Sequence, residues 1–158
     1  MTTLTELSAL FGRDLQKLMD ELRAYPDEAS IWWLPEASAG SDIKNSAGTL
    51  ALHLVGNLRH LIGAELGGLP YARDWAAEFS LRNVPRAELL AALDETAKIV
   101  RTTLTGLDEA SLEQPFPLNL AALGFPPGMT TSYLLLHLYG HLNWHLGQIN
   151  YHRRLRPA

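Results

Sequence analysis

The stretch HLYGHLNWHLGQINYHRR, residues 137–154, places four histidines and a glutamine on one side of a predicted helix. At 100° per residue these side chains fall within an arc of about 80°. They are His137, His141, His145, Gln148 and His152. Leu138, Leu142 and Ile149 flank the arc. The pattern therefore predicts a long helix whose imidazole-rich face lies at the edge of an apolar core.

Three further segments of the 158-residue chain show the apolar spacing of amphipathic helices, and no segment shows the alternation of a strand. The four predicted helices run from about Thr5 to Tyr25, from Asn45 or Ser46 to Leu66, from Pro85 to Gly106, and from Thr130 or Thr131 to Arg154. They predict an all-α fold, a single-domain antiparallel four-helix bundle over residues 1–158. The two middle connections, about 20 residues each, are long for a bundle. We expect them to cover one end of it and to shape a pocket.

The second predicted helix carries the two remaining histidines. His53 and His60 differ by only about 20° around the helix axis, and Asn57 lies between them on the same face. Leu54 and Leu61 lie beside that face, so it also borders the core. His60 is about 10 Å along the helix from His53, which is too far for the two to share an ion through helix rise alone.

Imidazoles in this arrangement are suited to a divalent metal ion. Neutral histidine is a common nitrogen ligand for zinc, nickel, iron and copper, and two histidines one turn apart can bind one ion. A third nitrogen from a facing helix would leave a coordination position open for water or substrate, as in catalytic zinc sites. Spacing alone allows His141 to pair with either His137 or His145. His152, near the chain end, is expected to be solvated.

The same segments resemble a known family. The segment HLYGHLNWHLGQINYHR resembles the last-helix motif of the DinB/YfiT-like metalloenzyme family, in which H-x3-H is followed by x-G-Q-I. This match places the motif on His141 and His145, with Gly147, Gln148 and Ile149 following. The absent side chain of Gly147 is expected to let a facing helix or ligand approach His145.

The second helix extends the resemblance. The stretch LALHLVGNLRH is similar to the family's second helix, whose metal-binding histidine falls on His53. The resemblance implies a DinB-like four-helix bundle, often dimeric, with a divalent metal ion on His53, His141 and His145. Zinc, nickel, iron and manganese are not distinguished. Relatives include thiol-dependent transferases and isomerases that use an external low-molecular-weight thiol.

The histidine pattern predicts a metal-dependent enzyme acting on a small molecule, such as a hydrolase, and the resemblance implies the more specific activity of a thiol-dependent S-transferase. The alternative is a non-catalytic metal-binding or interaction bundle, which a fourth protein ligand such as His137 would favour. Gln148 and Asn57 are candidates to orient a ligand imidazole or a metal-bound water. Arg59, Arg73 and Asp74 are candidates to bind an anionic substrate or thiol.

Composition excludes other classes of site and partner. The chain has no cysteine, so it has no disulfide, thiolate zinc cluster or cysteine nucleophile. A net charge of -4 gives no reason to expect nucleic acid. No segment has the length and apolarity of a membrane span, and no signal peptide is evident, which predicts a cytoplasmic protein. Trp32, Trp33 and Trp144 are expected in the core, in a pocket or at a homodimer interface.

Overall fold

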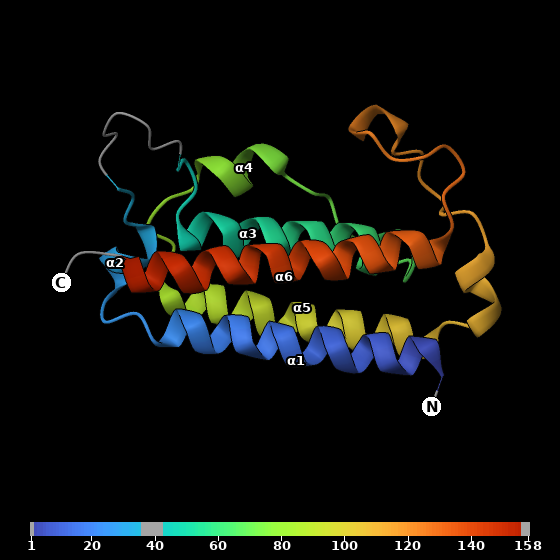
Figure 1. Ribbon diagram of the computed structural model, residues 1–158, viewed down its shortest axis with the longest axis horizontal. Coiled ribbons are helices and arrows are strands. Elements are labelled where there is room, and N and C mark those ends of the chain that lie inside the picture. Colours follow the sequence, from blue (N-terminus) through green and yellow to red (C-terminus); the bar gives the residue numbers. More distant parts are fainter. Residues whose placement is uncertain (1, 36–42, 156–158) are drawn as a thin grey trace.

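Four long helices packed side by side dominate the computed structural model, which describes residues 2–35 and 43–155 (Figure 1). They are α1 (Thr3–Arg23), α3 (Ala47–Leu58), α5 (Arg86–Gly106) and α6 (Thr131–Leu155). The connections contain α2 (Glu28–Trp32), α4 (Trp75–Ser80) and the 3-10 helices η2 (Glu109–Glu113) and η3 (Ala121–Leu123). The described residues form no β-strand, which confirms the predicted all-α four-helix bundle.

The directions of the helices differ from the antiparallel arrangement expected from sequence. In Figure 1, α1 and α6 run towards one end of the bundle, and α3 and α5 run towards the other. The connection at residues 65–85 returns along the bundle through α4, which packs on α3. This connection therefore covers the side of α3 and not an end of the bundle, and α5 begins at the same end as α3.

Polar side chains cap the N-termini of the helices, and buried apolar side chains pack the helices against one another. Thr2 and Ser46 cap α1 and α3 by accepting hydrogen bonds from the backbone N–H groups of Thr5 and Thr49. On α1 the stripe is fully buried and includes Phe11, Leu15, Leu18 and Leu22. The α5 residues that are buried against it include Leu89, Leu93, Val100 and Leu104. Each such side chain contributes about 1.5–3 kcal/mol on burial, so this stripe accounts for much of the core.

The second predicted helix ends in a π-helical segment, η1 (Arg59–Ala64), which the apolar periodicity did not predict. Arg59 donates hydrogen bonds to the hydroxyl of Thr96 at 2.9 Å and to the carbonyl of Ala92 at 2.9 Å. These bonds join η1 to α5. The proposed role of Arg59 in binding an anionic substrate is therefore not supported, because its guanidinium already has partners in the fold.

His152 is buried, which contradicts the expectation of a solvated residue at the end of the last helix. Its Nε2 lies 2.7 Å from the carbonyl oxygen of Trp33, and its Nδ1 lies 2.6 Å from the hydroxyl of Tyr25. The arrangement fits a neutral imidazole that donates from Nε2 and accepts at Nδ1. The histidine thus joins the end of α6 to the end of α1 and to the segment after α2.

Burial lowers the pKa of His152 below its ordinary value, against a smaller opposing effect of the Trp33 carbonyl. A group whose pKa is lower in the folded chain stabilises the fold fully above its unfolded pKa, about 6.5, and loses that contribution as the pH falls below it. We expect the free energy of unfolding in the presence of a chelator to fall between pH 7 and pH 5. His152→Gln should make the free energy of unfolding less dependent on pH. The reduction should be up to about 1.4 kcal/mol per pH unit, which corresponds to the uptake of one proton on unfolding. Urea denaturation at several pH values measures both slopes, and an unchanged slope would contradict the assignment.

The tryptophans expected in the core divide into two groups. Trp32 is buried against the backbone of Gly48, and the ring of Trp33 lies 5.4 Å from that of His152. Trp144 is 68% exposed, so a place in the core is wrong for it, and the expected place in a pocket or at a homodimer interface stays a prediction. Helical spacing placed Trp144 beside the histidine arc but did not show whether another part of the fold covers that side of α6.

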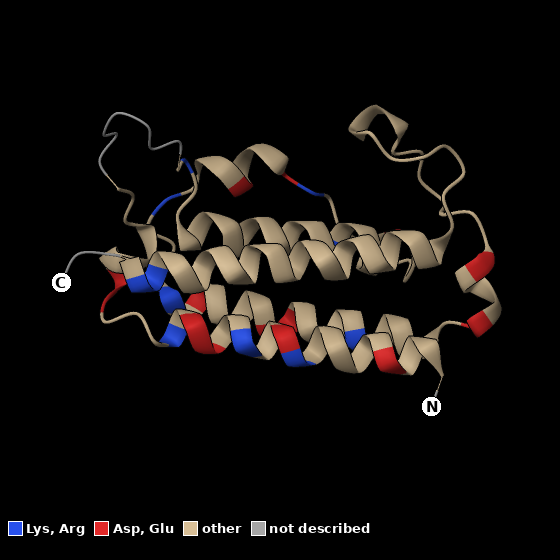
Figure 2. Ribbon diagram, viewed as in Figure 1, with Lys and Arg blue, Asp and Glu red and all other residues tan. Residues whose placement is uncertain are grey.

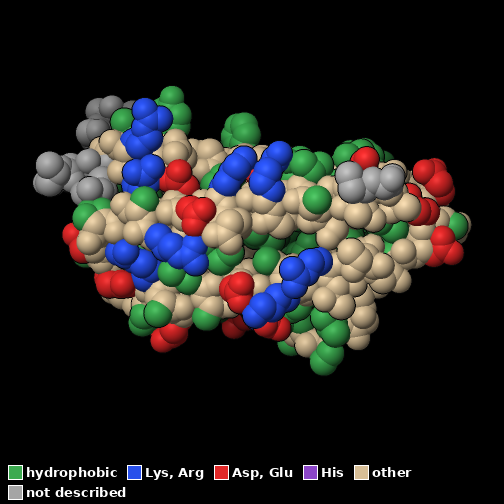
Figure 3. Space-filling model, turned by 90° about the horizontal axis from the view of Figure 1, so that it is seen from below, with side chains coloured by type: hydrophobic (Ala, Val, Ile, Leu, Met, Phe, Trp, Pro, Cys, Tyr) green, Lys and Arg blue, Asp and Glu red, His purple; other side chains and the backbone are tan. Residues whose placement is uncertain are grey.

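Charged side chains concentrate away from the histidine-bearing helices. Figure 2 shows Lys, Arg, Asp and Glu along α1, whereas α3 has none and α6 has none before Arg153. The face on the α1 side shows both signs of charge interspersed and no histidine (Figure 3). No helix in the described part of the chain is both long enough and apolar enough to cross a membrane.

Candidate metal centre

Three of the predicted ligands meet where α3 and α6 pack together. His53 comes from α3, and His141 and His145 come from successive turns of α6. The Nε2 atom of His141 lies 3.2 Å from that of His53 and 3.0 Å from that of His145. One ligand atom from each residue lies within 4.8 Å of the others, and no other group of three or more potential ligands is found among the described residues. The helices thus direct three ring nitrogens to one point.

The protein environment keeps these imidazoles neutral. Burial is the largest effect on all three, and together with repulsion from the neighbouring imidazoles and Arg73 it lowers the pKa of His141 to about 3. It also lowers the pKa values of His53 and His145. The hydrogen bonds that His53 donates to Glu78 and that His145 donates to Gln148 oppose this effect in part. A neutral imidazole has a free lone pair, so this donor set fits a divalent cation at neutral pH.

Two of the imidazoles are oriented by acceptors at the opposite ring nitrogen. The Nδ1 of His53 lies 3.0 Å from Oε2 of Glu78, and the Nδ1 of His145 lies 2.6 Å from Oε1 of Gln148. A proton held at Nδ1 leaves the lone pair on Nε2, which points towards the cluster. The predicted contact of Gln148 with a ligand imidazole is present. Glu78 was not predicted from sequence, because it is 25 residues from His53 and on the short helix α4.

Arg73 holds the Glu78 carboxylate in place. Its Nε and Nη2 atoms donate to the two carboxylate oxygens at 2.6 and 2.8 Å, and its guanidinium lies 4.3 Å from the centre of the Trp75 ring. Gly56 provides the space for the carboxylate, because a Cβ atom there would overlap Oε1 of Glu78. Arg73 therefore positions Glu78 in the structure, and its predicted binding of an anionic substrate or thiol stays a prediction.

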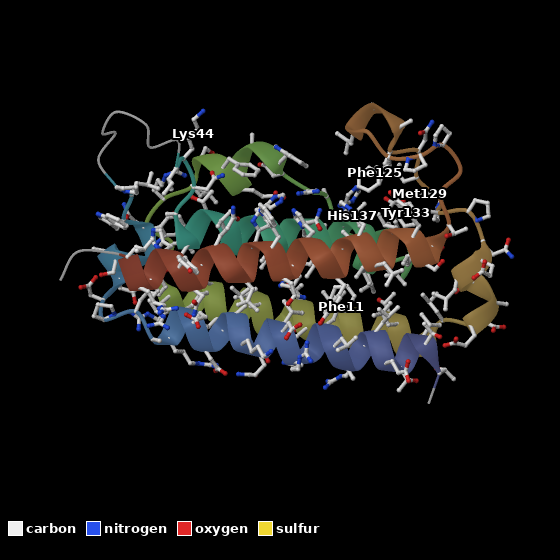
Figure 4. The ribbon with its side chains drawn as sticks, in the orientation of Figure 1. Phe11, Lys44, Phe125, Met129, Tyr133 and His137 are labelled. Atoms are coloured by element: carbon white, nitrogen blue, oxygen red, sulfur yellow. The ribbon has the colours of Figure 1, made fainter. Side chains whose placement is uncertain are left out.

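The remaining histidines of the two helices lie outside the cluster. The ring of His137 packs 4.7 Å from that of Phe125 and stacks on His141 at 6.1 Å (Figure 4). His60 belongs to η1 and has no hydrogen-bonding partner at Nδ1. The structure thus groups His145, and not His137, with His141. No atom lies within 4 Å of a Cβ built on Gly147, so the expected approach of a facing helix was wrong, and the expected approach of a ligand stays a prediction.

A pocket of about 400 Å³ opens beside the cluster. Its walls come from α3, η1, α6, the segment that precedes and begins α4, and the connection between α5 and α6. The polar lining consists of His53, Asn57, His60, Arg73, His137 and His141, and most of the accessible lining is apolar. Both long connections therefore contribute to the pocket, as expected from their length.

Comparison with known proteins identifies the family and the fold. The profile described as the DinB superfamily matches residues 10–149. The crystal structure titled "conserved protein of locus from Enterococcus faecalis" superposes with a TM-score of 0.73 at 20% identity, over 98% of this chain and 97% of that chain. No curated protein gives a significant match. The structural likeness shows a shared fold, and the profile spans all three clustered histidines, so the chain belongs to the DinB superfamily.

Proposed function

We propose that this protein is a metal-dependent enzyme of the DinB superfamily, with one divalent ion bound by His53, His141 and His145. The observation that carries the proposal is the convergence of three Nε2 atoms, two of them in rings with an acceptor at Nδ1. Three neutral protein ligands leave a coordination position for water or substrate. The three ligands are all histidines, and the chain has no cysteine that would favour a thiolate-binding metal. This ligand set does not select zinc over nickel, iron or manganese.

A bound divalent ion supplies Lewis acidity and lowers the pKa of a coordinated water or thiol. Residues of the chain itself orient the metal-binding imidazoles. Glu78 and Gln148 fix the orientation of two imidazoles, and Arg73 fixes Glu78. The apolar walls of the adjoining pocket exclude water from a bound small molecule. This arrangement supports attack on a small electrophile at neutral pH, as in a hydrolase.

The resemblance to thiol-dependent relatives supports a more specific version, in which an external low-molecular-weight thiol is the nucleophile and the enzyme is an S-transferase. The chain has no cysteine to compete with such a thiol. We place this reaction in the cytoplasm, where thiols remain reduced. The alternative remains a non-catalytic bundle in which the ion only joins α3 to α6.

An exchangeable coordination position distinguishes the enzyme from the alternative. The test is the visible spectrum of the full-length protein loaded with cobalt(II), recorded before and after addition of azide. An open position predicts a saturable change of the ligand-field bands, because azide replaces a bound water. A spectrum that azide leaves unchanged would indicate a closed site and would favour the non-catalytic bundle. A matched titration of His137→Ala shows whether His137 blocks the position.

A further inference from the structure

Two carboxylates are buried in the described part of the chain, and each of them is paired with an arginine. They are Asp14 of α1 and Glu78 of α4. Arg73 binds Glu78, which contacts Nδ1 of His53, the ligand that α3 provides. A charge is unfavourable in the interior unless it is paired, and the best-attested role of a buried pair is to select one arrangement of packed helices. Asp14 is therefore a candidate to position another part of the metal centre.

Asp14 joins α1 to α6 through a closed network of hydrogen bonds. The Nε and Nη2 atoms of Arg13 donate to its two carboxylate oxygens, each at 2.8 Å. The hydroxyl of Tyr139 donates to Oδ2 at 2.7 Å and accepts from Nη2 of Arg13 at 2.8 Å. The hydrogen bonds from Arg13 hold the pKa of Asp14 well below its usual range, against burial and with further contributions from Tyr139 and Lys17. The carboxylate is thus charged at neutral pH.

Tyr139 lies on the opposite side of α6 from the metal ligands. It precedes His141 by two residues, which corresponds to a rise of about 3 Å and a rotation of about 200°. Its ring packs against that of Phe11 on α1, with 5.5 Å between the ring centres. The helix is therefore held by its hydroxyl contact with α1 on one side and directs imidazoles towards His53 on the other. A movement of α6 that breaks the contact with Asp14 must also move His141 relative to His53.

The apolar contacts of α6 leave its position along the bundle axis less well defined. Its buried side chains include four leucines that recur within a few residues, Leu134, Leu135, Leu138 and Leu142. Because similar side chains repeat along the helix, a shift of one turn, about 5.4 Å, exchanges one leucine contact for another. One turn before Tyr139 stands Leu135, which has no hydrogen-bond donor for Asp14. Zinc–nitrogen bonds of about 2.0–2.1 Å tolerate deviations of only about 0.2 Å, so a metal site needs a far more exact register.

A second polar attachment of α6 to α1 lies beyond the ligands. Asn150 and Arg153 donate to the carboxylate of Glu21 at 2.7 and 2.6 Å. The α6 ligands thus belong to the segment between two attachment points on α1, which runs alongside α6 (Figure 1). The side chain of Glu21 is 19% exposed, whereas that of Asp14 is 0% exposed. Water cannot replace a lost partner of Asp14, so this contact has the larger influence on the register.

We propose that Asp14 and Tyr139 are positioning residues of the metal centre, which fix the register of α6 so that its two histidines meet His53. The zinc measurement below rests on the proposed function, but the register of α6 can also be measured in metal-free protein. Tyr139→Phe removes the hydroxyl and keeps the ring against Phe11. Asp14→Asn keeps the shape of the side chain and removes its charge.

The first test follows the imidazoles of the chelated, full-length protein by NMR, with helical content verified by circular dichroism. The Nε2 atoms of His53 and His141 are 3.2 Å apart, so the ring protons beside them should give an NOE in the wild type. This NOE should weaken or disappear in Tyr139→Phe and in Asp14→Asn. The NOE between His141 and His145, which are both on α6, is the internal control and should be unchanged.

The second test measures zinc affinity by chelator competition and the visible spectrum of the cobalt(II) form. Each variant should lose about 10–100-fold in zinc affinity, the range typical of residues that orient ligands, and the ligand-field bands should shift because the donors are displaced. The double variant should lose no more than the weaker-binding single variant, since both residues act through one contact. Val100→Ala, at a buried position on α5, is the matched control. It should lower the urea midpoint and leave the NOE and the zinc affinity unchanged.

The two tests separate this role from the proposed function. A weakened NOE in a protein that binds no zinc would support the positioning of α6 and would count against the proposed function alone. Absence of the NOE in the wild type, or an NOE and a zinc affinity unchanged in both variants, would overturn the role of Asp14 and Tyr139. Equal losses in Val100→Ala would also overturn it, because they would show a general effect of stability.

Discussion

Replacement of His141 by alanine is expected to lower the affinity for zinc by more than about 100-fold, while helical content stays unchanged. His141 is the central member of the cluster, since its Nε2 lies within 3.2 Å of the Nε2 atoms of both His53 and His145. Loss of a ligand should exceed the 10–100-fold effect typical of the residues that orient ligands. Competition titration with a chromophoric zinc chelator measures the affinity.

Two further variants separate the alternatives that helical spacing left open. His145→Ala should lose as much affinity as His141→Ala, and His137→Ala should lose no more than about 10-fold, because its ring stacks beside the cluster without joining it. The reverse order would show that the ion binds His137 and His141, one turn closer to the start of α6.

Substitution of Gly56 by alanine is expected to weaken both the metal centre and the fold. The added Cβ would overlap Oε1 of Glu78, so the carboxylate must move away from α3 and from Nδ1 of His53. We expect a loss of about 1–3 kcal/mol in the free energy of unfolding from overpacking, and a 10–100-fold loss of zinc affinity from the displaced acceptor. Urea denaturation and the same chelator competition measure the two quantities.

A glycine elsewhere in the bundle provides the control. A Cβ on Gly12 of α1 would meet no atom within 4 Å, so Gly12→Ala should stabilise the helix by about 0.5–1 kcal/mol and leave zinc affinity unchanged. Glu78→Gln keeps the shape of the acceptor and removes its charge, so it should also weaken zinc binding. Normal zinc affinity in both Gly56→Ala and Glu78→Gln would contradict a role of Glu78 in holding His53.

The local periodicity of the sequence was sufficient for the fold class but not for its topology. Apolar residues at helical spacing, such as Phe11, Leu15 and Leu18, identified α1, and the other long helices followed in the same way. Periodicity has no information on the path of a connection, so the return of residues 65–85 along α3 was not predicted. The π-helical segment η1 also escaped prediction, because one widened turn barely changes the apolar pattern.

The site was predictable where its residues share a helix. His141, His145 and Gln148 are three or four residues apart, so helix geometry alone placed them together. Glu78 is held near His53 by tertiary packing, and the chain around it shows no histidine or metal-binding spacing. The error at His152 has the same origin, because a position near a chain end does not reveal that Tyr25 lies opposite it.

The central claim is that three histidines form one metal site, and the most direct measurement is the zinc stoichiometry of the untagged protein. Elemental analysis after dialysis against buffered zinc, together with calorimetric titration of the chelated protein, gives the number of bound ions. The structure predicts one equivalent per chain, which is lost in the triple variant His53→Ala/His141→Ala/His145→Ala and retained in His60→Ala. Absence of bound zinc, or one equivalent retained in the triple variant, would contradict the claim.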